Sequence, residues 1–170
     1  DEFTIPAGQT WTITRLEVFG YQTGSTTTST FTGLNFRIWN GAPNAGGTIL
    51  FGDTSTNRLT GSNFSNIYRD SETTVGNNQR PIMTLDGNVG SLVLGPGTSY
   101  VDWAAAGSVA TGPFFPPITI NGQNTTGNAL QFTVSTSTWA NAVDPGTGTP
   151  PQGMPFKLYG SVANTGPLIF

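Results

Sequence analysis

The stretch LNFRIWNG (34–41) alternates apolar and polar side chains until it reaches an Asn-Gly pair. Period-two alternation places Leu34, Phe36 and Ile38 on one face of a β-strand and Trp39 on the opposite face. The Asn-Gly pair is a strong turn signal, because both residues tolerate the positive φ of tight hairpin turns. The stretch therefore predicts a strand that buries one face of a sheet.

Short segments of the same kind recur along the chain between Gly-, Pro- and Asn-rich turns. We expect strands at residues 3–5, 11–18, 34–39, 48–51, 67–69, 82–85, 91–94, 98–103, 118–120, 130–134 and 155–159. The alternation slips near Arg15, which predicts a β-bulge. No long window keeps helical spacing without Gly or Pro, so the expected fold is a single all-β sandwich, jelly-roll-like or Ig-like.

Composition excludes several classes of function. The chain has 170 residues, suited to one domain, and contains no cysteine and no histidine. Disulfides, thiolate or imidazole metal sites and Ser-His-Asp catalysis are therefore impossible. Five arginines and one lysine do not make the basic surface of a nucleic-acid binder. No apolar run approaches 18 residues, so no membrane-spanning helix is expected.

Three long Gly/Thr/Pro-rich loops are expected at residues 23–32, 104–117 and 142–153. We expect the β-sandwich domain to occupy residues 1–160 and an extended C-terminal tail to follow at 161–170. The sparse charge and the polar, Thr-rich composition are typical of secreted modules, so an extracellular or cell-surface location is expected.

The C-terminal tail is the most informative segment, because it ends in three large apolar residues. Exposing such side chains costs about 1.5–3 kcal/mol each, so something should cover them. Either the tail is the last strand of its own domain, or it adds as a donor strand to a neighbouring copy. The candidate donor residues are Val162, Pro167, Leu168, Ile169 and Phe170. The N-terminal strand, with Phe3 and Ile5, is a second candidate edge for such an exchange.

Sugar binding is the alternative, since it needs exposed aromatic rings beside hydrogen-bonding side chains. Tyr21, Trp39 and Trp139 are candidate platforms, and packing inside the fold is the competing interpretation for each. Two glycosylation sequons begin at Asn63 and Asn124.

The segment Asp53-Thr54-Ser55-Thr56-Asn57 permits either a calcium loop or a turn capped by the Asp53 side chain. No spacing of carboxylates singles out a catalytic pair, so we expect no enzyme activity and no cofactor.

Several motifs resemble a group of secreted bacterial surface domains that are largely uncharacterised. The resemblance rests on the following segments: 3–33 (FTIPAGQTWTITRLEVFGYQTGSTTTSTFTG), 34–59 (LNFRIWNGAPNAGGTILFGDTSTNRL), 66–69 (NIYR), 80–83 (RPIM), 94–103 (LGPGTSYVDW) and 155–160 (PFKLYG). It implies a secreted β-sandwich and carries over no catalytic residues.

The sequence thus favours a structural subunit that self-associates into an extracellular fibre or surface assembly. Its partners would be copies of itself. The alternative is a secreted carbohydrate-binding or adhesive module, whose partners would be glycans. A hydrolase is the least favoured class, and neither nucleic acid nor membrane insertion is expected.

Overall fold

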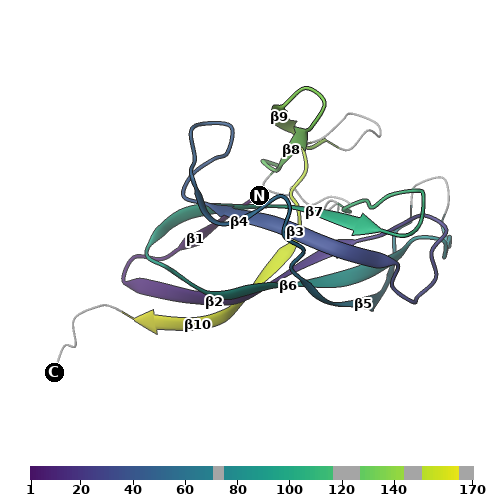
Figure 1. Ribbon diagram of the computed structural model, residues 1–170, viewed down its shortest axis with the longest axis horizontal. Helices are drawn as coiled ribbons and strands as arrows, with labels where there is room; N and C mark the ends of the chain where they lie inside the picture. Colours follow the sequence, from purple (N-terminus) through teal and green to yellow (C-terminus); the bar gives the residue numbers. More distant parts are fainter. Residues whose placement is uncertain (71–74, 117–126, 144–150, 165–170) are drawn as a thin grey trace.

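A computed structural model describes residues 1–70, 75–116, 127–143 and 151–164. Within these residues the protein is all-β, as predicted, and its two main sheets pack face to face as a sandwich (Figure 1). The strand expected at 118–120 lies outside the described residues.

The first sheet has the strand order β1-β7-β3-β4, and the second has the order β10-β2-β6-β5. All neighbouring strands are antiparallel. The strands of the first sheet are β1 (Glu2–Ile5), β7 (Gly97–Gly107), β3 (Phe31–Trp39) and β4 (Ile49–Asp53). Those of the second are β10 (Phe156–Asn164), β2 (Gln9–Gly20), β6 (Pro81–Leu94) and β5 (Leu59–Tyr68). A separate hairpin, β8 (Leu130–Thr133) and β9 (Thr138–Asn141), stands beside the first sheet (Figure 1).

The structure joins some predicted strands and lengthens others. The segments expected at 82–85 and 91–94 are parts of the single strand β6. The predicted bulge is confirmed, because the pairing of β2 with β6 shifts register between Ile13 and Arg15. The turn after β3 is also where it was expected, and Asn40 closes it by exchanging hydrogen bonds with Thr48.

The core forms where the inner faces of the two sheets meet. The predicted inward residues Leu34, Phe36 and Ile38 are each at most 1% exposed. Phe36 reaches across to β6, where a Cβ on Gly87 would lie 2.6 Å from its ring. The other buried apolar residues of this cluster are Ile5, Ile13, Leu16, Val18, Phe31, Met83, Leu85, Val89, Leu94 and Val101.

The 23–32 loop is anchored to the sandwich rather than free. Gln22, at its base, is fully buried, and its amide donates to the carbonyl of Val109 while its oxygen accepts from Thr30. The loop expected at 104–117 begins only after Gly107, where β7 ends, and its residues Phe114 and Phe115 pack on Tyr21 and Trp103, respectively. The two loops therefore close one end of the sandwich together.

Gly160 provides a test of the β10–β2 pairing. A Cβ at this position would lie 1.8 Å from the carbonyl oxygen of Thr12, at the register shift that follows Tyr159. We expect Gly160→Ala to lower the free energy of unfolding by about 1–3 kcal/mol. Gly95→Ala is the matched control, because a Cβ there meets nothing within 4 Å. Urea denaturation of both variants checks this, and equal midpoints would contradict the packing described.

Candidate functional site

The candidate site lies where two edge strands meet, at the side of the sandwich formed by β1 and β10. Each strand is the outermost member of its sheet. Ile5 of β1 and Gln9 of β2 flank the turn that links these two strands, and Asn164 at the end of β10 pairs with Gln9. The ends of β1 and β10 therefore come together at one end of the molecule (Figure 1).

β10 is longer than the sequence indicated, and the predicted domain boundary after residue 160 is wrong. Residues 161–164 continue the strand and pair with Gln9–Thr12 of the same chain. Val162 is thus part of its own chain's sheet rather than of a separate tail. The other candidate donor residues, Pro167, Leu168, Ile169 and Phe170, lie outside the described residues.

Val162 lies on the inner face of β10 yet is 58% exposed. It is the register partner of Trp11, and opposite residues of an antiparallel pair share a face. Trp11 in turn stacks on Phe3 of the first sheet, with ring centroids 6.3 Å apart. Val162 therefore points into the space between the sheets at a place that the first sheet does not cover.

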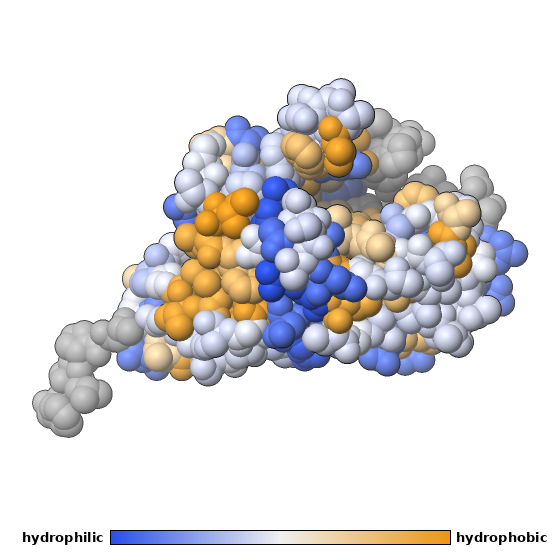
Figure 2. Space-filling view, in the orientation of Figure 1, coloured by the Kyte–Doolittle hydropathy of each residue, from blue (hydrophilic) through white to orange (hydrophobic). Residues whose placement is uncertain are grey.

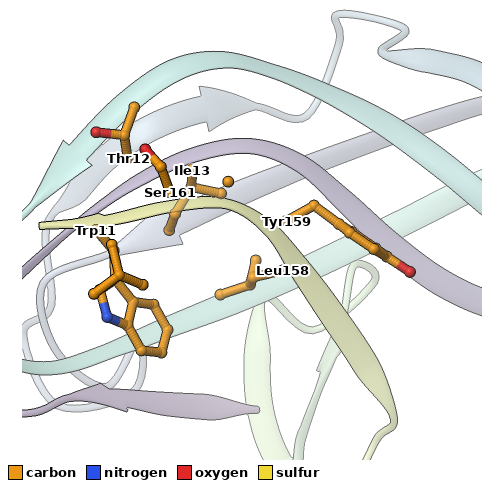
Figure 3. Close-up of a pocket in the computed structure, with 8 residues that line it drawn as sticks. Trp11, Thr12, Ile13, Leu158, Tyr159 and Ser161 are labelled. Atoms are coloured by element: carbon orange, nitrogen blue, oxygen red, sulfur yellow. The ribbon is translucent and has the colours of Figure 1, made fainter.

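A shallow depression of about 150 Å³ lies at the same place (Figure 3). Its wall includes Leu158, Gly160 and Val162, and Figure 3 shows Trp11 and Leu158 on the same side of the strands. The depression is smaller than the roughly 300–1,000 Å³ of typical small-molecule pockets.

β1 is firmly seated on the core despite lying at an edge. Ile5 is 1% exposed, and Phe3 contacts the rings of Trp11 and Phe156. Exchanging this strand between copies would uncover both side chains. β1 is thus held in place, and among the described residues no strand pairs with its outer backbone edge.

A buried carboxylate anchors β10 to β2. Glu17 accepts hydrogen bonds from the Lys157 ammonium at 2.8 Å and from the Tyr159 hydroxyl at 3.0 Å. Burial disfavours ionisation of Glu17, but these two hydrogen bonds and the charges of Lys157 and Arg15 outweigh it and hold its pKa below the ordinary value. Sequence reasoning missed this group, since its members meet only once the strand register is known.

Asp53 caps its own turn. Its carboxylate accepts hydrogen bonds from the backbone and hydroxyl groups of Thr56 and Ser55. The backbone hydrogen bond from Thr56 is the largest of several that lower the pKa of Asp53. Of the two interpretations left open for this segment, the structure favours the capped turn. Within the described residues no three metal-ligating side chains cluster.

The three candidate sugar platforms do not form one surface. Trp39 is only 9% exposed, because its indole donates to Asp102 and the guanidinium of Arg37 lies 4.7 Å from its ring. Although Trp39 points outward as expected, its ring is covered and is not open for stacking with a sugar. Tyr21 packs on Phe114 near the start of β3, whereas Trp39 ends that strand.

Trp139 lies on the β8–β9 hairpin and pairs with Phe132, with centroids 5.0 Å apart. Phe132, which sequence reasoning did not single out, is 38% exposed. Asn63 is an exposed residue of β5, while Asn124 lies outside the described residues.

The face shown in Figure 2 carries apolar areas beside a strongly polar band, without one dominant polarity. Comparison with protein-family models, with curated proteins and with solved structures finds no match. The resemblance to bacterial surface domains therefore remains a prediction. In the part of the chain that the structure describes, no helix is long and apolar enough to cross a membrane.

The Glu17 group predicts an acid-sensitive fold. Because the pKa of Glu17 is lowered on folding, its contribution is complete above the unfolded pKa of about 4.3 and is lost as the pH falls through the folded pKa. We expect Glu17→Gln to lower the melting temperature at pH 7 by about 2–4 °C, equivalent to about 1 kcal/mol, and by less at pH 3. Thermal melts from pH 7 to 3 measure this. The pKa of the Asp53 carboxyl is also lowered, so Asp53→Asn is measured alongside to separate its contribution. If the melting temperatures of the wild type and Glu17→Gln changed in parallel with pH, the prediction for Glu17 would be contradicted.

Proposed function

We propose that this protein is a structural subunit of an extracellular fibre or surface assembly, and that copies associate by adding a strand at the β1–β10 side. The observation that carries the proposal is Val162, an inner-face residue left 58% exposed at the end of an edge strand. The sequence that follows β10 ends in Leu168, Ile169 and Phe170. An open edge and an apolar segment of the same chain are the two halves of a strand-addition contact.

The composition of β10 supports this proposal. Edge strands commonly avoid pairing with other chains through charged side chains, proline or bulges. β10 has one charged residue, Lys157, and that lysine is engaged by Glu17. At the register shift after Tyr159 the extra residue is Thr14 of β2, so β10 carries no bulge of its own, and its residues 160–164 carry no charge. A contact that repeats head to tail without closing a ring would build a filament.

The proposal includes a location and a topology. A secreted, cell-surface or extracellular location suits a chain with so little charge, and we propose that the sandwich is jelly-roll-like or Ig-like. No catalytic role and no cofactor are proposed.

The assembly prediction is tested by changing the apolar end in the full chain. We expect the wild type to form large species by size-exclusion chromatography and filaments by negative-stain microscopy. Leu168→Ser with Phe170→Ser should remain monomeric, because two anchors of the contact are lost. Val134→Ser is the control, since Val134 is 81% exposed in the β8–β9 turn and far from this edge in sequence. A monomeric wild type at all concentrations would refute the proposal.

The pair of the exposed Phe132 and the half-buried Trp139 favours carbohydrate binding as the second candidate function. The two rings share a face of the hairpin with Asn141, whose amide can hydrogen-bond a sugar hydroxyl. We expect any glycan retained on an array to be lost with Trp139→Ala, by about tenfold or more. Trp39→Phe serves as the buried control, and absence of binding to every glycan would leave assembly as the sole proposal.

A further inference from the structure

The shallow depression beside the end of β10 and the neighbouring edge of β1, together called the groove, identify the part of the molecule that would receive a neighbour. Leu158, Gly160 and Val162 alternate along the inner face of β10, and their register partners Leu16, Ile13 and Trp11 lie on the same face. The lining of the depression also includes the polar side chains of Thr12, Tyr159 and Ser161, but no charged residue. The depression therefore fits an uncharged occupant.

β1 lies beside the depression, since Phe3 of β1 stacks on Trp11, which lines it. It pairs with β7 on one side, and within the described residues no strand pairs with its other side. Its outward N–H and C=O groups can therefore hydrogen-bond an added strand. Such a strand would extend the first sheet and cover Val162 from above.

The C-terminal segment has the chemistry and the length to be this strand. Leu168 and Phe170 alternate, so both point to one face of an extended segment while Ile169 points to the other. β1 offers four residues of edge, enough to pair with residues 167–170. Neither Leu168, Ile169 nor Phe170 carries a charge that the groove would have to bury.

The length of the connection decides which copy supplies the segment. Only Thr165, Gly166 and Pro167 separate the end of β10 from Leu168. Three residues span about 10 Å, which is the spacing between packed sheets, and leave no length for reversing direction. Pro167 also fixes its own φ. A connection this short favours exchange with a neighbour over closure on the same chain.

We propose that the groove formed by β1 and Leu158–Val162 is the acceptor site for residues 167–170 of a second copy. The inference rests on the proposed assembly and names both halves of its contact. Each subunit would then offer one groove and one C-terminal strand, which is a heterologous contact.

Cross-linking tests the assignment directly, because the chain has no cysteine of its own. We expect the full chain carrying Val162→Cys and Leu168→Cys to form a ladder of disulfide-linked multimers on non-reducing gels, because Leu168 would be on the face of the added strand that covers Val162. The control pairs Val134→Cys with Leu168→Cys, since Val134 is an exposed valine outside the groove. A ladder no stronger than the control would overturn the groove assignment. A disulfide-closed monomer would overturn it as well, by showing that the segment folds back on its own chain.

A second pair of variants separates this inference from the proposed function. Val162→Lys should weaken association about tenfold or more, whereas Val93→Lys, at an exposed valine of β6, should not. Circular dichroism checks that both variants fold. Normal assembly of Val162→Lys, with loss of assembly in the Leu168→Ser/Phe170→Ser variant, would place the acceptor elsewhere and leave the proposed function standing. A chain that never assembles would overturn both.

Discussion

The contact between Phe36 and Gly87 ties the two sheets together at the middle of the sandwich. Gly87 leaves the room that the ring needs, and Phe36 fills it at 1% exposure. Because the chain has no cysteine and its described residues form few ion pairs, apolar packing of this kind must supply most of the stability. The strands that flank this contact are held by the core, while strands farther out depend on local interactions.

β10 is such an outer strand, and it is held by polar contacts as much as by apolar ones. Phe156 and Leu158 pack against the core, but Lys157 and Tyr159 hold the opposite face through Glu17. Beyond the bulge these anchors cease, and the remaining residues are held by backbone pairing with β2. The change from anchored to unanchored strand coincides with the exposed Val162.

The sequence predicts the local features of this fold better than its arrangement. Alternation identified the inner face of β3, and the slip at Arg15 located a real bulge, since both depend on residues close in the chain. The burial of Trp39 was not predictable, because Asp102 reaches it only through the pairing of β3 with β7. The end of β10 was misjudged for a similar reason. Ser161–Asn164 has little apolar character, and its partner strand lies some 150 residues earlier in the sequence, so pairing rather than pattern makes it a strand.

The antiparallel pairing of β10 with β2 also determines how the molecule would bear a load. A pull on the chain beyond Asn164 acts along the axis of β10, toward the end where Gln9 lies. Along that direction the backbone hydrogen bonds from Phe156 to Asn164 are strained together in shear, instead of opening one after another. The ion pair between Lys157 and Glu17 lies near the start of β10, at the end opposite to the applied force, and adds to the resistance there. A subunit linked through its C-terminus would therefore resist tension with the whole length of its last strand.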